Sequence, residues 1–200
     1  MSSRLRVHLG LQALQGEDPF RWFGLGRYVR ELALSLVREH SEVVAGLEVD
    51  AALVMPGAVE DFAGLGLLHQ WPYDLRDMAR KREFRIYHVM SPFSPYPTYR
   101  LFPPAFARAG ARLAVTLHDL IPWIYPETYL RETSVKGWYR ARLKLVQAAD
   151  LVIAVSHSAA ADAVRLLDID PGSGEDIVCD ARRLDTLPPA QFDAIYCSQP

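Results

Sequence analysis

The residues best suited to chemistry in this chain are the neighbours His118 and Asp119. An imidazole and a carboxylate both exchange protons and form directed hydrogen bonds. They directly follow Leu113–Leu117, an apolar run between Gly110 and Pro122 that is typical of a strand buried on both faces. Ligands of open parallel sheets bind outside the carboxyl ends of the strands, so we take this pair as the candidate catalytic residues. A structural, hydrogen-bonded histidine is the alternative for His118.

A second strand with polar residues at its end repeats this arrangement. Leu151–Val155 is apolar, and Ser156 and His157 follow where we expect a helix to begin, with Ser156 as its N-cap. A serine hydrolase triad of Ser156, His118 and Asp119 is disfavoured because no GxSxG elbow is present. The six histidines show no pair at metal-ligand spacing and no cysteine partner, so we expect no metal site.

The third candidate is a glycine turn formed by Gly24 and Gly26 with Arg27. It lies between a strand expected over Arg4–Leu11 and a helix with apolar residues at helical spacing from Leu25 onward. Glycines at such a turn let backbone N–H groups and the helix N-terminus approach a phosphate. A turn that binds no ligand fits the spacing equally well, because short glycine matches often occur without function.

The elements that must position these residues alternate between strand and helix. We expect a strand over Arg85–Met90, followed by a proline-rich and aromatic loop, and an amphipathic helix over Lys136–Ala149. A second aromatic loop is expected over 121–130, a short strand at Ala51–Met55 and a helix within Trp71–Glu83. This alternation predicts an α/β fold with a Rossmann-like, doubly wound, mostly parallel sheet.

Composition and charge exclude several classes of protein. The 200 residues are 50% hydrophobic with a formal net charge of -2, which suits a large core and argues against a nucleic-acid partner. Cys179 and Cys197 lie in apolar runs and indicate core residues in a reducing compartment. Without a secretory segment or a membrane-spanning apolar run, a cytoplasmic protein is expected. A stripe of Lys136, Arg140 and Lys144 favours a solvated helix face over contact with anionic lipid.

Three segments, taken together, resemble the N-terminal half of family 4 glycosyltransferases. They are GLGRYVRELALSL after the first strand, VTLHDLIPWIYPETY, and KGWYRARLKLVQAADLVIAVSHSAAADAVRLL. Their order and spacing match over about residues 4–167. The resemblance implies a GT-B architecture of two Rossmann-like domains that bind a nucleotide sugar as substrate, with no metal or other cofactor. It also implies transfer with retention of configuration to a glycan or lipid-linked acceptor. Contact of the basic stripe with the inner face of the membrane stays the alternative to a solvated helix face.

The same resemblance implies roles for the candidate residues. Gly24, Gly26 and Arg27 would lie near the donor phosphates, His118 would border the reacting sugar, and Ser156–Ser158 would close the floor of the cleft. The donor-binding half of this family, with its arginine and lysine phosphate clamp, is not found in the sequence. We therefore expect the chain to be an incomplete half of a glycosyltransferase.

The last segment, 166–200, departs from that family. Its stretches LDIDP, DIVCDA and FDAIYCS are similar to the second, third and fourth strands of class I methyltransferases that use S-adenosylmethionine. By that similarity Asp168 or Asp170 would lie near the ribose of S-adenosylmethionine and Asp180 near its adenine. The glycine motif that should precede these strands is absent.

Two units follow from these resemblances. We expect an acceptor-side Rossmann-like domain over 1–167 and an incomplete methyltransferase-like segment over 168–200, with the junction near Arg165–Asp170. One alternative is that the tail supplies further strands of a single α/β domain. For the chain as a whole, the alternatives to a glycosyltransferase are a methyltransferase fragment and a non-catalytic binding module.

Overall fold

Strands and helices alternate along the chain, which a computed structural model describes at residues 5–11, 14, 24–39, 47–53, 68–70, 86–94 and 98–169. The strands are β1 (Leu5–Gly10), β2 (Leu47–Leu53), β3 (Leu68–Gln70), β4 (Ile86–Val89), β5 (Arg112–Leu117) and β6 (Leu151–Ala154). The helices are α1 (Leu25–Glu39), α4 (Thr98–Leu101), α5 (Pro104–Ala109), α6 (Ile121–Ile124), α7 (Pro126–Tyr129), α8 (Thr133–Gln147) and α9 (His157–Leu167).

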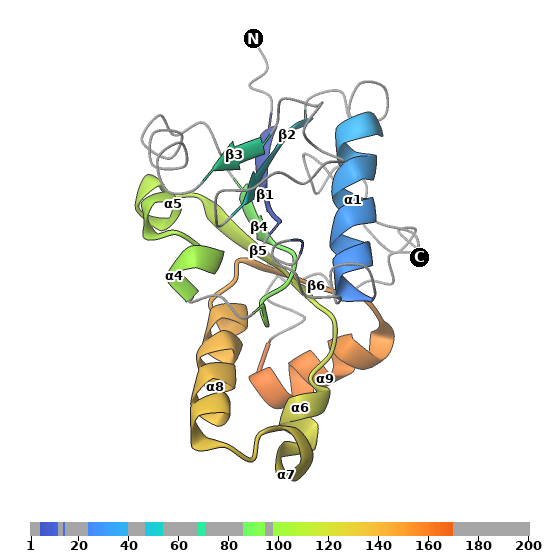
Figure 1. Cartoon of the computed structure of the whole chain (residues 1–200), viewed down its shortest axis with the longest axis vertical. Helices are drawn as coiled ribbons and strands as arrows, with labels where there is room; N and C mark the ends of the chain where they lie inside the picture. Colours follow the sequence, from blue (N-terminus) through green and yellow to red (C-terminus); the bar gives the residue numbers. More distant parts are fainter. Residues whose placement is uncertain are drawn as a thin grey trace.

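The strands form one parallel sheet in the order β3-β2-β1-β4-β5-β6 (Figure 1). Neighbouring parallel strands need long crossovers, and α1 and α8 supply them between β1 and β2 and between β5 and β6. This strand order confirms the predicted Rossmann-like, doubly wound class. The order reverses between β1 and β4, and folds of this kind bind their ligands at the carboxyl ends of the strands at that point.

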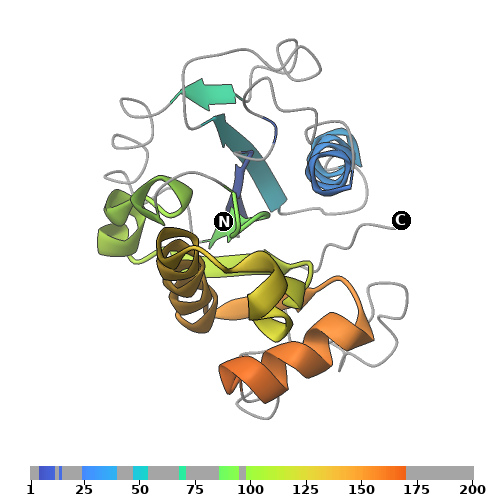
Figure 2. The same cartoon turned by 60° about the horizontal axis from the view of Figure 1, so that its bottom comes forward.

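Helices lie on both faces of the sheet. One face carries α1 and the other carries α4, α5 and α8, while α9 runs beside β6 (Figures 1 and 2). A strand covered on both faces needs apolar side chains in both directions, and in β5 every residue after Arg112 is buried. Thr116 is the one polar residue among these buried positions of β5, and it lies on the face of the sheet toward α1.

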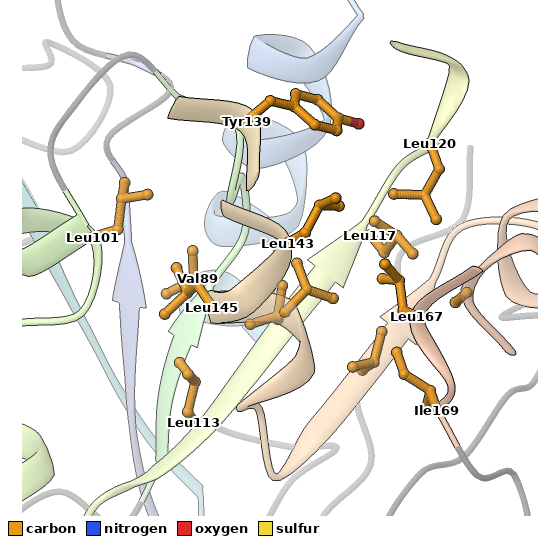
Figure 3. Packing of buried hydrophobic residues seen from close by; sticks show 14 of the residues in the cluster. Val89, Leu101, Leu113, Leu117, Leu120, Tyr139, Leu143, Leu145, Leu167 and Ile169 are labelled. Carbon is orange, nitrogen blue, oxygen red and sulfur yellow. The ribbon is translucent and has the colours of Figure 1, made fainter. Parts of the chain in front are cut away.

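The larger apolar cluster lies between the sheet and α8 (Figure 3). Leu117 at the end of β5, Leu143 in α8 and Leu167 in α9 all belong to it, each 5% exposed or less. Burial of one such side chain contributes about 2 kcal/mol. This packing fixes the carboxyl end of β5, and with it His118, relative to α8.

The segment after β5 differs from the prediction. We expected an aromatic loop over 121–130, but Ile121–Ile124 and Pro126–Tyr129 form the short helices α6 and α7. Each helix has a proline in its first turn. Proline fits there because its fixed φ suits a helix and because first-turn N–H groups have no partner within the helix. The two prolines of this segment therefore each lie in the first turn of a short helix.

Other predicted elements are present with shifted ends. β2 begins at Leu47 rather than at Ala51, and α8 begins at Thr133 rather than at Lys136. Arg140 and Lys144 are exposed on α8, as a solvated helix face requires. The helix predicted within Trp71–Glu83 lies outside the described residues.

Candidate functional site

The candidate residues meet at the carboxyl edge of the sheet because the strands are parallel. His118 follows β5, Met90 follows β4, and Gly24 precedes α1, the helix that follows β1. β4 lies between β1 and β5 in the sheet, so these three segments are neighbours in space although they are distant in sequence. This edge includes the switch point, the place between β1 and β4 where the strand order reverses.

His118 is held by a backbone carbonyl of the neighbouring strand. Its Nε2 lies 3.1 Å from the carbonyl oxygen of Met90, which can only accept, so Nε2 carries the hydrogen and donates it. In the neutral ring, Nδ1 is then the acceptor nitrogen. The ring of Tyr28 meets the ring of His118 edge-on, with centroids 4.8 Å apart and an angle of 87°.

Burial keeps the His118 imidazole neutral. Desolvation lowers its pKa below the usual value of 6.5, and this outweighs the opposing effects of the Met90 hydrogen bond and the Asp119 charge. A neutral imidazole with its Nε2 hydrogen already engaged can accept a hydrogen bond through Nδ1 from a ligand hydroxyl. It is poorly suited to donate a proton at neutral pH.

A buried polar group that the sequence reasoning did not identify lies behind His118. The hydroxyl oxygen of Thr116 in β5 lies 2.8 Å from Nε2 of His88 and 3.5 Å from the hydroxyl oxygen of Tyr28. Burial, with a smaller effect from His118, lowers the pKa of His88 to about 3, so His88 is neutral as well. The one signal in the sequence was Thr116, a polar residue inside an apolar strand.

Asp119 is exposed and tied to the start of α6. Its Oδ1 accepts a hydrogen bond of 3.0 Å from the backbone N–H of Ile121. This contact gives Asp119 a local role in ordering the turn before α6. Its catalytic role stays a prediction. Its charge also acts on Tyr139 of α8, whose pKa is raised mainly by burial and then by Asp119.

The glycine turn has the geometry expected of a helix start. Gly24 has a φ of 50°, in the left-handed region that glycine adopts most readily, and its carbonyl accepts the first hydrogen bond of α1, from Tyr28. Gly26 is buried in the first turn, and Arg27 is exposed. Because Tyr28 also contacts His118, the turn and His118 belong to one cluster.

Ser156 is the N-cap of α9, as predicted. Its Oγ accepts a hydrogen bond of 3.1 Å from the N–H of Ala159. His157, the first residue of α9, is exposed. Both residues follow β6 and lie at the same edge of the sheet as His118, because β5 and β6 are parallel neighbours. Their predicted place at the floor of a donor cleft stays a prediction.

The methyltransferase-like reading of the tail is not supported. Leu167, where the LDIDP stretch begins, is the last residue of α9, and Asp168 is its C-cap with a φ of 56°. These two residues end a helix and do not begin a strand. Asp170 and Asp180, the other predicted S-adenosylmethionine contacts, lie outside the described residues.

Strand order, helix placement and the polar cluster at the switch point together define the class: a Rossmann-like α/β domain with its candidate site at the carboxyl edge. The family model described as Glycosyltransferase Family 4 matches residues 23–175, which is more than half of the chain. The chain therefore belongs to glycosyltransferase family 4. The matched range continues across the junction that we expected near Arg165–Asp170.

A search of curated proteins finds no match to the chain. Within the part of the chain that the structure describes, no helix is both long enough and apolar enough to cross a membrane.

Proposed function

We propose that this domain is the acceptor-side half of a retaining GT-B glycosyltransferase. In the proposed reaction, the bond between the sugar and the diphosphate of a nucleotide sugar breaks, and a bond to an acceptor hydroxyl forms with the same anomeric configuration. The nucleotide sugar is a substrate, and the proposal includes no metal or other cofactor. The acceptor is a glycan or a lipid-linked sugar.

The observation that carries the proposal is the geometry of His118 in a domain of this family. Its Nε2 is engaged by the carbonyl of Met90, and its ring packs against Tyr28, which belongs to the first turn after Gly24. A ligand that reaches both the glycine turn and His118 must extend along this edge. A diphosphate joined to a sugar has that shape, with its charge toward the N–H groups of α1 and its hydroxyls toward His118.

Each group then has a distinct task. The first N–H groups of α1 face the negative phosphates, with exposed Arg27 on the same turn to add positive charge. His118 accepts a hydrogen bond from a sugar hydroxyl through Nδ1 and so orients the sugar. In GT-B enzymes a second domain supplies most of the remaining contacts to the leaving diphosphate, so these groups alone should bind the donor weakly.

Exposed aromatic rings support a sugar-containing acceptor. Tyr125 and Tyr129 lie on the segment that follows His118, and they are 60% and 54% exposed. Aromatic faces pack against the apolar faces of sugar rings, while their hydroxyls stay in contact with water. The proposal includes a cytoplasmic location for the protein. A lipid-linked acceptor would bring it to the inner face of the membrane.

The test is a titration of the ¹⁵N-labelled chain with nucleotide sugars, namely UDP-glucose, UDP-N-acetylglucosamine and GDP-mannose, followed by amide chemical shifts. We expect at least one to produce saturable shifts at Gly24–Tyr28, Met90–Ser94 and His118–Leu120, with a Kd in the millimolar range or weaker. Gly26→Val should raise that Kd, because a side chain there obstructs approach of the phosphates. Gly137→Val, on an exposed position of α8, is the matched control.

Two results would count against the proposal. One is an absence of saturable shifts with all three nucleotide sugars. The other is saturable, micromolar binding of S-adenosylmethionine, which would favour the methyltransferase alternative. Shifts that persist unchanged in Gly26→Val would remove the phosphate role of the turn and leave His118 as the remaining contact.

A further inference from the structure

Arg142 of α8 is a charged side chain inside the core, with 1% of its surface exposed. Its Nη1 donates a hydrogen bond of 2.8 Å to the hydroxyl of Thr98, and its Nη2 donates a longer one of 3.4 Å to the carbonyl of Ser94. The guanidinium also lies over the ring of Trp138, 5.3 Å from its centroid. Among the described residues, no carboxylate forms an ion pair with Arg142.

A buried cation with only neutral partners is costly to the fold. Desolvation lowers the pKa of Arg142 to about 10, so the side chain stays charged at neutral pH. Apolar side chains of similar volume often replace buried charged groups with no loss of stability. Core packing therefore gives no reason for a guanidinium at this position. What it supplies, and an apolar side chain does not, is a pair of directed donors.

One of those donors reaches the turn that follows β4, at the Ser94 carbonyl, and the other reaches Thr98, the first residue of α4. The turn is closed by two hydrogen bonds between Ser91 and Ser94, one from the Ser94 N–H to the Ser91 carbonyl and one between their hydroxyls. Phe93 at its tip stacks on Tyr139, one helical turn before Arg142, with ring centroids 4.5 Å apart and planes 11° from parallel. α8 therefore contacts this turn at two points, by the stacking of Tyr139 on Phe93 and by the hydrogen bond from Arg142 to the Ser94 carbonyl.

The same turn begins next to the carbonyl that holds His118. Met90 immediately precedes Ser91, and its carbonyl oxygen accepts the Nε2 hydrogen of His118. A displacement of the turn would move this carbonyl, and Nε2 would lose its acceptor. Either ring nitrogen could then carry the hydrogen, so Nδ1 would no longer be fixed as the acceptor.

We propose that Arg142 is a positioning residue for His118, acting through the Ser91–Ser94 turn and the Met90 carbonyl to fix which ring nitrogen of His118 carries the hydrogen. Its relevance to sugar transfer rests on the proposed function. The physical link itself is independent of any substrate and can be measured in the unliganded chain.

The experiment records long-range ¹H–¹⁵N spectra of the histidine rings, which distinguish the two neutral tautomers, with His118 assigned by its absence in His118→Gln. In the wild type, His118 should be in the Nε2–H form. In Arg142→Met it should become a mixture of both tautomers, with the His88 signals still at their wild-type positions as evidence of an intact core. Arg142→Lys, which keeps the charge and one donor direction, should restore the Nε2–H form at least in part.

Thr98→Val, at the first residue of α4, removes the hydrogen bond that orients the Arg142 guanidinium beside Ser94, and it keeps the proposal testable if Arg142→Met fails to fold. It removes the acceptor of the shorter hydrogen bond and should produce a smaller change of the same kind. Arg112→Met is the matched control, since Arg112 pairs with Asp150 at the amino-terminal end of β5, away from His118. A His118 tautomer that is unchanged in Thr98→Val, and in Arg142→Met if that variant folds, would overturn the proposal, whatever the nucleotide-sugar titration shows.

Discussion

At the scale of single residues, the chemistry of His118 depends on its partners more than on its residue type. The Met90 carbonyl engages Nε2, burial keeps the ring neutral, and the edge-on contact with Tyr28 restricts its rotation. A ring held in this way presents an acceptor nitrogen in a fixed direction. That suits recognition of a hydroxyl better than release of a proton.

His88 makes the stability of the fold sensitive to acid. Its pKa is about 3 in the folded chain and about 6.5 in an unfolded one, so between these values the unfolded state binds a proton that the folded state does not. The free energy of unfolding should therefore fall as the pH falls below about 6.5, by about 1 kcal/mol per pH unit for a histidine of this kind. His118, whose pKa is also lowered, acts in the same direction.

Urea unfolding at a series of pH values from about 7.5 to about 5 measures this slope. His88→Gln places a side-chain amide close to the position that Nε2 of His88 occupies in the wild type. The amide can still form a hydrogen bond with Thr116 but does not titrate, so the free energy of unfolding of this variant should depend less steeply on pH. His157→Gln, the same substitution at an exposed histidine, is the matched control. Equal slopes in His88→Gln and the wild type would show that His88 is not the source of the acid sensitivity.

At the scale of elements, two glycines, one directly before a helix and one inside a helix, should respond in opposite ways to the same substitution. Gly24 has a φ of 50°, which alanine adopts at a cost of about 1 kcal/mol although the space around it is open. Gly137 lies inside α8 with ordinary φ and open space, where alanine should stabilise by about 1 kcal/mol.

Urea denaturation of Gly24→Ala and Gly137→Ala measures both changes in the free energy of unfolding. Gly24→Asn is a useful companion because asparagine tolerates the left-handed region better than alanine and should cost less. If Gly24→Ala proved as stable as the wild type, the turn before α1 would not need glycine for its backbone conformation.

The start of α9 gives a second prediction at this scale. Ser156 satisfies one of the first N–H groups of the helix, so Ser156→Ala should lower the free energy of unfolding by about 1 kcal/mol. Ser158→Ala, two residues further into the same helix and exposed, is the control and should have a much smaller effect. Thermal and urea unfolding of both variants compare them, and equal losses would mean that the Ser156 hydroxyl does not act as a cap.

At the scale of the whole molecule, the candidate site exists because of the strand order. The hydroxyls of Tyr28 and Thr116 approach each other although the two residues are 88 positions apart in the sequence. They can do so because β4 is the only strand between β1 and β5 in the sheet. The helix after β1 and the strand end at His118 consequently share one edge. A different strand order with the same local elements would separate them.

The local character of the chain could be predicted from its amino-acid sequence. The apolar run of β5 with polar residues directly after it predicted a buried strand that ends at His118, and the alternation of strand and helix predicted the doubly wound class. Three motifs in order identified the family. These features could be predicted because a parallel strand, a helix cap and a glycine turn each depend mainly on residues close together in the chain.

The surroundings of His118 could not be predicted in this way, because they depend on how distant segments pack together. Its closest polar partner is the Met90 carbonyl, a backbone group that every residue has and that therefore leaves no signal in the sequence. The aromatic contact of Tyr28 and the hydrogen bond from Arg142 to the Ser94 carbonyl join segments whose proximity follows from strand order and crossover packing. Such contacts depend on which segments pack side by side, and short-range patterns carry no record of that choice.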